Sequence, residues 1–230
     1  TSLQREANGR FGFSARVTLQ LAQALYEKHK VLTYPRTDAR ALPEDYIPTV
    51  NEVVRGLPDQ YAPFANEIVK QGWIKPNKRI FNNAKISDHF AIIPTGVVPK
   101  SLSDAEHKIY DLVTKRFLAV FYPAAEYQIT TRITRVEGEA FKTEGKVLVN
   151  PGWLTVYGKE AANDDKDTKE GGSPQLVAVK QGETVSTEDI LLKSLQTKPP
   201  ARFNEATLLS AMEGAGKMVD DEELRAAMAE

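Results

Sequence analysis

A tyrosine and an arginine two positions apart are the residues of this chain best suited to act on a phosphate. They belong to the run Leu32-Thr33-Tyr34-Pro35-Arg36-Thr37-Asp38. We expect a strand here, with Tyr34 and Arg36 on one face and the stiffening Pro35 on the other. The guanidinium can hold two phosphate oxygens and neutralise charge at phosphorus, within reach of the phenol oxygen. The simpler alternative is a strand entering a turn, with the tyrosine packed and the arginine in solvent.

The composition limits the classes to which the chain can belong. Its 230 residues include 30 Lys and Arg against 31 Asp and Glu, so any site for a polyanion must be local. The absence of cysteine excludes disulfides, thiolate zinc sites and cysteine nucleophiles, and fits a reducing compartment. No apolar run has membrane-spanning length. Because the chain starts with neither an initiator methionine nor a signal peptide, we expect a piece of a longer protein.

Helical spacing of apolar residues predicts several helices. The first covers 14–30, with Ser14 as its N-cap. Another follows the capping box Ser103-Asp104-Ala105-Glu106 and ends near Pro123. The remaining helices are expected at 44–54, 61–70 and, capped by Asn204, 205–213. Residues 72–100 are punctuated by proline and glycine, so we expect a loop with short extended pieces.

Beyond Pro123 the periodicity becomes alternating, which predicts β-structure. A hairpin is expected with its turn at Glu137-Gly138-Glu139. Further strands are expected at 153–157, 175–179 and 184–195. Residues 161–174 lack periodicity and are expected to form a mobile surface loop. Its aspartates lack the sixth-position glycine and the closing glutamate of a calcium loop, so we expect no metal there.

Five strings of the chain stand out together. They are Leu3-Gln4-Arg5-Glu6-Ala7-Asn8, Gly12-Phe13-Ser14-Ala15, Leu32-Thr33-Tyr34-Pro35-Arg36-Thr37-Asp38, Ser87-Asp88-His89-Phe90-Ala91-Ile92-Ile93-Pro94-Thr95 and Lys198-Pro199-Pro200-Ala201-Arg202-Phe203. Type IA DNA topoisomerases have such strings in the same order, and the chain resembles that family over nearly its entire length. The resemblance is strongest to bacterial topoisomerase III. Many members of that branch have a second histidine where this chain has Phe90, so that position receives no role.

The resemblance implies catalytic roles for three residues. Tyr34 matches the nucleophile, which attacks a phosphodiester of one DNA strand and retains the 5′ phosphate. Arg36 matches the arginine that holds this phosphate, and His89 matches a histidine from which we expect a hydrogen bond to phosphate rather than a base role. DNA contacts are also expected of Thr37, Arg5, Arg16 and Ser87. For the arginines at 5 and 16, ordinary surface charge is the alternative.

The resemblance also implies an α+β protein of several domains. Residues 4–122 are expected to form a mainly helical, mobile domain with the tyrosine, and 123–197 an antiparallel β arch that hinges it. Residues 198–230 are expected to begin a further helical segment that is cut short. In the family, magnesium is held by acidic residues of a separate N-terminal Toprim domain, and no such cluster occurs here. We therefore expect a fragment that is inactive without that domain and its Mg²⁺.

Transfer of a phosphodiester to tyrosine conserves the energy of the bond, so such an isomerase cleaves and reseals DNA without ATP. The chain has no P-loop motif. We expect a monomer that binds single-stranded DNA in the bacterial cytoplasm, at the nucleoid, with no membrane association. A non-catalytic single-stranded DNA-binding or scaffold module is the alternative, with weak, salt-sensitive binding. A tyrosine recombinase would need more arginines and histidines on a helical fold, and the β region argues against it.

Overall fold

A computed structural model describes residues 1–158, 176, 179–215 and 222. The chain divides into two compact units. The first comprises Thr1–Phe121 and the described residues from Ala201 onward, and the second is Tyr122–Pro200. The predicted loop at 161–174 and most of the predicted strand at 175–179 lie outside the described residues.

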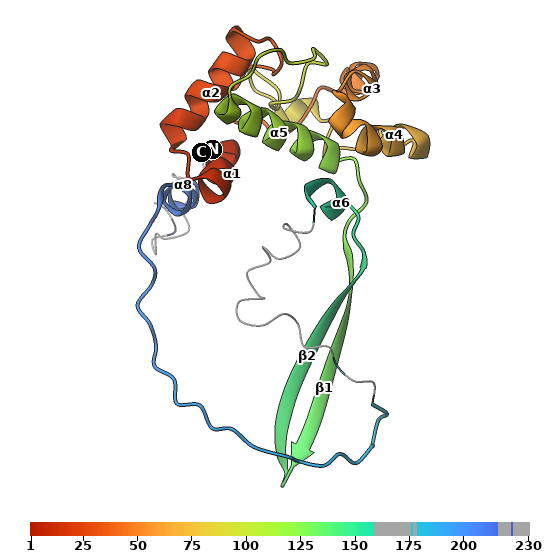
Figure 1. The fold of residues 1–230 in the computed structure, drawn as a ribbon, viewed down its shortest axis with the longest axis vertical. Coiled ribbons are helices and arrows are strands. Elements are labelled where there is room, and N and C mark those ends of the chain that lie inside the picture. The colour runs from red at the N-terminus through yellow and green to blue at the C-terminus, as the bar shows by residue number, and fades with distance from the viewer. Residues whose placement is uncertain (159–175, 177–178, 216–221, 223–230) are drawn as a thin grey trace. The chain divides into compact units, whose positions relative to one another are not determined.

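The first unit is helical (Figure 1), and its helix at residues 2–11 is one that the sequence analysis did not predict. Its elements are α1 (Ser2–Phe11), α2 (Ala15–Glu27), η1 (Glu44–Tyr46), α3 (Ile47–Arg55), η2 (Asp59–Tyr61), α4 (Ala62–Gln71), η3 (Asn83–Lys85), α5 (Asp104–Ala119) and α8 (Glu205–Glu213). The segment between α4 and α5 is loop with one short 3-10 turn and isolated bridges, which confirms the expectation for this region.

The predicted N-caps are confirmed. The Ser14 hydroxyl accepts from the Val17 N–H at 3.2 Å and so satisfies one free donor at the start of α2. Ser103 and Glu106 form the reciprocal capping box of α5. Asn204 caps α8 through the Thr207 N–H at 2.8 Å. Polar side chains at helix starts therefore set three helix boundaries directly from local sequence.

The core of the first unit lies where α2 packs against α5, and α4 also contacts α5 (Figure 1). Leu25 of α2 and Ile109 of α5 have no exposed surface, and Ile68 of α4 is equally buried. Each such side chain contributes roughly 2 kcal/mol through removal from water. The helical unit thus supplies a rigid support for the loops that cross it.

A buried hydrogen bond joins the end of α2 to the start of α5. His29 Nε2 lies 3.1 Å from Glu106 Oε1, and both side chains are almost fully buried. Hydrogen bonds from the Ser103 backbone and hydroxyl, followed by His29, lower the pKa of Glu106 to about 2. The capping carboxylate thereby also fixes the point at which the chain leaves α2 toward Tyr34.

The second unit contains a long antiparallel hairpin of β1 (Glu126–Val136) and β2 (Glu139–Asn150) (Figure 1). Val136 pairs with Glu139, which leaves a two-residue turn. Glu137 and Gly138 both have positive φ, 48° and 86°, as a type I′ turn requires. Helices together with an antiparallel sheet confirm the α+β class.

Two predicted strands of the second unit are wrong. Residues 153–157 form a helical turn, α6 (Leu154–Tyr157), because Gly152 takes φ +46° and the chain then closes helical hydrogen bonds. The rings of Trp153 and Tyr157 make an edge-to-face contact along that turn, with their centroids 5.7 Å apart. Residues 184–195 are not a strand, and their apolar side chains are exposed, Leu192 by 99%. Apolar spacing over so short a stretch does not separate helix, strand and coil.

Candidate active site

The site is built from two loop segments that lie side by side on the helical unit. The tyrosine segment (residues 31–42) and the histidine segment (residues 80–95) exchange backbone hydrogen bonds. The Thr33 N–H donates to the Ile93 carbonyl at 3.0 Å and the Thr95 N–H to the Val31 carbonyl at 3.1 Å. Their pairing holds the two sequence motifs together although they are far apart in the chain.

The tyrosine segment is not the predicted strand, because it pairs through isolated bridges at Leu32 and Leu42 alone among the described residues. Pro35 contributes no N–H to a ladder, which accounts for the interruption. Burial differs from residue to residue in the Tyr-Pro-Arg tripeptide. Pro35 is buried, Tyr34 is half-buried and Arg36 is exposed.

The ring of Tyr34 contacts two other rings. Its centroid is 4.3 Å from that of His89, with the planes inclined by 45°. The Tyr26 ring of α2 makes an edge contact with it at 5.4 Å. Within the described residues, the Tyr34 hydroxyl has no hydrogen-bond partner. The structure thus brings Tyr34 and His89 together, and Tyr26, which the sequence analysis did not single out, supports the tyrosine.

Tyr61 and Tyr110 differ from Tyr34 because they are buried. Tyr61 is buried and donates to the Asp111 carboxylate at 2.9 Å, and its pKa is raised, first by burial and then by the Asp111 charge. Burial also raises the pKa of Tyr110. A phenol that is harder to ionise and sealed from solvent cannot attack a nucleic-acid strand. These two side chains are core residues.

Arg36 and Arg16 line one groove along α2. The groove has a volume of about 540 Å³, and its polar lining comprises Arg16, Gln20, Gln23, Glu27, Lys28 and Arg36. This lining has three cationic side chains, two amides and one carboxylate, so its net charge is positive. Such a surface is suited to binding an anionic chain. The structure therefore groups the arginine of the tyrosine segment with the helix arginine for which a DNA contact was expected.

The hydroxyls of Thr37 and Ser87 are engaged inside the site. Thr37 donates to the His89 carbonyl at 2.7 Å, and Ser87 donates to the Asp38 carboxylate at 3.2 Å. Both bonds run between the tyrosine segment and the histidine segment. The neighbour of the histidine, Phe90, packs its ring against Tyr46 at 5.0 Å.

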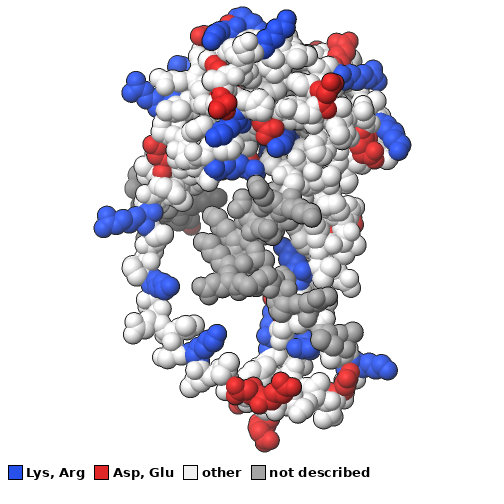
Figure 2. Space-filling view, in the orientation of Figure 1, with Lys and Arg blue, Asp and Glu red and all other residues white. Residues whose placement is uncertain are grey.

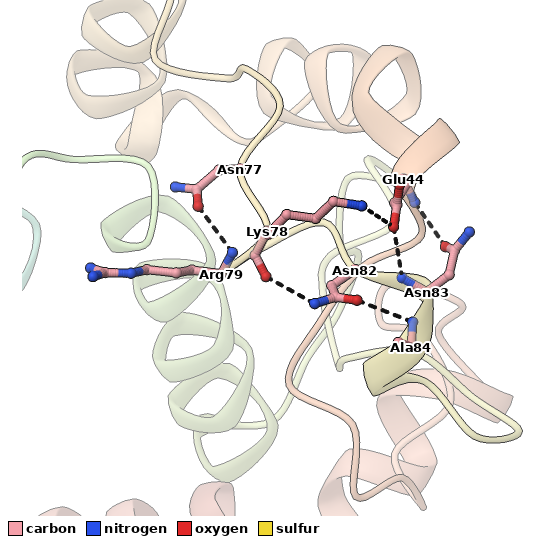
Figure 3. Close-up of polar contacts among 7 residues, drawn as sticks. All are labelled: Glu44, Asn77, Lys78, Arg79, Asn82, Asn83 and Ala84. Atoms are coloured by element: carbon pink, nitrogen blue, oxygen red, sulfur yellow. Dashed lines mark hydrogen bonds and ion pairs between the residues drawn. The ribbon is translucent and has the colours of Figure 1, made fainter.

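A network of amide side chains fixes the loop at residues 77–84, where the chain enters the histidine segment (Figure 3). The Glu44 carboxylate of η1 forms an ion pair with Lys78 at 2.7 Å. The Glu44 backbone N–H donates to the Asn83 amide oxygen at 3.0 Å. The Lys78 hydrogen bond and then the Asn83 N–H lower the pKa of Glu44. Asn82 donates to the Lys78 carbonyl and accepts from the Ala84 N–H. The loop is thereby held to the chain that leaves the tyrosine segment.

The helix α8 contacts α1 and the start of α2 (Figure 1). The Glu205 carboxylate accepts from the Ala15 N–H at 2.5 Å, at the positive end of the α2 dipole. The Asn8 side chain accepts from the Ala206 N–H at 3.3 Å. Both contacts join residues far apart in sequence.

Glu213, at the end of α8, forms ion pairs with Arg5 and Arg40. Its carboxylate lies 2.5 Å from Arg5 and 3.8 Å from Arg40, and it also accepts the Thr1 hydroxyl. The Thr1 hydrogen bond and then both arginines lower the pKa of Glu213. Arg5 is thus half of an ion pair in this structure. No local pattern in the sequence indicated this pairing.

Acidic and basic side chains are interspersed over the visible face of the helical unit (Figure 2). This fits the near-zero net charge of the chain. Among the described residues, no group of three or more histidine, aspartate or glutamate side chains is placed to hold a metal ion. No helix in the same part of the chain has both the length and the apolar character needed to cross a bilayer.

Comparison with known proteins gives a consistent family. A family model described as DNA topoisomerase matches residues 1–216. The chain is 47% identical over 225 residues to DNA topoisomerase 3 of Bacillus subtilis, which covers 97% of the chain and 31% of that relative. It is 48% identical over 224 residues to DNA topoisomerase 3 of Bacillus cereus, covering 96% of the chain and 30% of the relative. The chain therefore spans about 30% of the length of these relatives.

Proposed function

The chain belongs to the DNA topoisomerase family, and we propose that it is the nucleophile-bearing part of a type IA, topoisomerase III-like isomerase. In this proposal the enzyme cleaves one DNA strand, passes a strand through the break and reseals it. The observation that carries the proposal is the contact between Tyr34 and His89 at 4.3 Å, in two motifs tied by hydrogen bonds. A half-buried phenol beside an exposed imidazole can meet a phosphodiester at the surface, and the exposed Arg36 follows two residues on.

The proposed cleavage exchanges one phosphate ester for another. The Tyr34 hydroxyl releases its proton to solvent as its oxygen attacks phosphorus, a new oxygen–phosphorus bond forms, and the bond to the 3′ oxygen of the preceding nucleotide breaks. The 5′ phosphate stays on the tyrosine, and the 3′ oxygen departs as a hydroxyl by taking up a proton. Resealing is the reverse attack by that hydroxyl. Because no high-energy bond is consumed, the cycle needs no ATP.

Arg36 and His89 stabilise this exchange in different ways. Arg36 offers a planar fork of donors to two non-bridging oxygens and offsets the charge that accumulates on them. His89 contributes one hydrogen bond from an exposed ring whose position is fixed by the histidine segment. The groove that joins Arg36 to Arg16 extends the cationic surface along α2, where it can follow the backbone of a single strand.

Magnesium, which the resemblance implies, does not fit the residues described here, because they offer no cluster of carboxylates. We propose that the metal-holding half of the site lies in the part of the relatives that this chain does not cover. On that basis the 230-residue chain alone binds single-stranded DNA weakly and does not relax supercoils. We further propose that the enzyme acts as a monomer at the bacterial nucleoid.

A relaxation assay tests this function. The longer enzyme that contains this chain is expected to relax negatively supercoiled DNA with Mg²⁺ and without ATP. Tyr34→Phe is expected to abolish relaxation, because the ring stays and the nucleophilic oxygen is lost. Tyr127→Phe in β1 removes a phenol from the second unit and serves as the matched control. Relaxation by Tyr34→Phe at the control rate would reject the assignment.

A non-catalytic single-stranded DNA-binding module is the second candidate, favoured by the groove with Arg16 and Arg36. The two functions differ in the bond to DNA. A binding module releases its oligonucleotide in denaturant, whereas a topoisomerase stopped in mid-cycle keeps it. Capture of a labelled oligonucleotide on a denaturing gel therefore decides between them.

A further inference from the structure

We propose that Thr37 is a positioning residue, which fixes the backbone of His89 so that the imidazole stays against the Tyr34 ring. The inference rests on the proposed function, because it matters for a reaction at these two rings. Its basis is a bond between the two motifs: the Thr37 hydroxyl donates to the His89 carbonyl at 2.7 Å. The role differs from the DNA contact expected from the sequence.

The single proton of the Thr37 hydroxyl is committed within the protein. A threonine hydroxyl has one donor and two acceptor positions. The donor goes to the His89 carbonyl, and one acceptor position takes the Ala39 N–H at 3.0 Å. The remaining lone pair repels a phosphate oxygen instead of binding it. Thr37 therefore acts on His89 from inside the fold and has no donor left for DNA.

The backbone at His89 needs such a bond, because residues 87–89 form bends outside any helix or strand. On one side of the histidine, Ser87 is tied to Asp38 through its side chain. On the other side, the Ala91 N–H donates to the Ala41 carbonyl at 3.0 Å. The Thr37 bond lies between these two ties and acts on the residue that carries the imidazole.

A loss of this bond is expected to act on the rate of cleavage more than on DNA affinity. The imidazole is exposed, and its contact with Tyr34 depends on where the backbone holds it. Displacement of a reacting group by about 1 Å can lower a rate by roughly 100-fold. Arg36 and Arg16 keep their positions on the groove, so binding of the strand is retained.

Three variants isolate the hydroxyl. Thr37→Val keeps the branched shape and removes the donor, whereas Thr37→Ser keeps the donor. Thr18→Val is the matched control, since the Thr18 hydroxyl donates to the Ser14 carbonyl at 3.0 Å within α2, away from His89. If Thr37→Val does not fold, Thr37→Cys repeats the comparison with a thiol, which is a weak donor.

The first readout is the NMR shift of the His89 imidazole protons in the 230-residue chain. The Tyr34 ring current displaces these signals, and Tyr34→Leu provides the reference without it. Thr37→Val is expected to move the His89 signals toward that reference, whereas Thr37→Ser and Thr18→Val keep the wild-type shift. Wild-type His89 shifts in a folded Thr37→Val or Thr37→Cys would overturn the proposal.

The second readout is oligonucleotide cleavage by the longer enzyme. Thr37→Val is expected to lower the cleavage rate by at least about tenfold with an oligonucleotide Kd within about twofold of wild type, and Thr37→Ser to restore the rate. A Thr37→Val enzyme that loses affinity but keeps its rate would show a DNA contact instead. Tyr34→Phe, measured in parallel, distinguishes failure of the proposed function from failure of the proposed role of Thr37. If Tyr34→Phe still cleaves, the proposed function fails. If Tyr34→Phe is inactive and Thr37→Val cleaves at the wild-type rate, only the role of Thr37 fails.

Discussion

The ring centroids of Tyr34 and His89 lie 4.3 Å apart, although the two motifs are separated by two α-helices and three short 3-10 helices of the chain. The contact depends on hydrogen bonds between the tyrosine segment and the histidine segment rather than on a continuous sheet. Both segments are loops carried on a helical core whose main contacts are buried and apolar. A rigid support with loops at its surface is the usual arrangement of a reactive site.

Tyr26 is expected to hold the ring of Tyr34 through its edge contact from α2. Tyr26→Leu removes that aromatic contact, which is worth about 1 kcal/mol, and frees the nucleophile to rotate. We expect an oligonucleotide cleavage rate about tenfold lower, with Tyr26→Phe close to wild type because the ring is kept. Equal cleavage rates for Tyr26→Leu and Tyr26→Phe would show that the contact does not matter.

Arg36→Lys is expected to be a damaging change even though the charge is kept. Lysine presents a point charge and cannot hold two phosphate oxygens in one plane. We expect cleavage and resealing at least about tenfold slower, with a smaller change in the Kd for single-stranded DNA. The same exchange at Arg55, an exposed residue of α3, is the control. If the Arg36→Lys enzyme cleaves and reseals as fast as the Arg55→Lys control, Arg36 acts only through its positive charge.

The capping box of α5 is expected to contribute to the free energy of unfolding of the helical unit. Ser103→Ala removes the cap and a partner of Glu106, and should lower the free energy of unfolding by about 1 kcal/mol. Chemical denaturation of the 230-residue chain measures this difference. An unfolding midpoint unchanged by the substitution would contradict the structure at this helix start.

The Glu106 carboxylate is expected to make the stability of the helical unit depend on pH. The pKa of Glu106 is lowered to about 2 in the folded protein from an ordinary value of 4.5. The stabilisation it gives is complete above about pH 4.5 and is lost as the pH falls toward 2. Glu106→Gln should flatten this part of the curve of stability against pH. A curve that keeps its slope there would assign the acid sensitivity to other carboxylates.

Glu213 is expected to limit the affinity for DNA, because it holds Arg5 and Arg40 in ion pairs. Glu213→Gln frees two cations and should tighten binding of a labelled single strand a few-fold at low salt, with a steeper salt dependence. Glu188→Gln changes the charge equally on an exposed part of the second unit. If both variants bind alike, Arg5 and Arg40 do not reach the strand.

Local features of the fold were predictable from the sequence, and long-range ones were not. Ser14, Ser103 and Asn204 marked helix starts because a cap acts within three residues. The hairpin turn followed from Glu137-Gly138 in the same way. The helical turn at 153–157 was missed, since its apolar residues fit a strand equally well.

The candidate site shows the same division. Tyr34, Arg36 and His89 stood out through motif and chemistry, and the structure brings the tyrosine to the histidine. The support from Tyr26 and the Glu213 ion pairs depend on tertiary contacts between residues far apart in the chain. Spacing along one sequence carries no signal for such contacts.

The central claim is that the oxygen of Tyr34 becomes bonded to a DNA phosphate. The most direct measurement is peptide mapping by mass spectrometry of the longer enzyme, trapped with a cleaved oligonucleotide by denaturant. We predict that the nucleotide mass is found on the peptide that contains Tyr34, through its 5′ phosphate, and is absent from Tyr34→Phe. A nucleotide on a different residue, or cleavage without any adduct, would contradict the account.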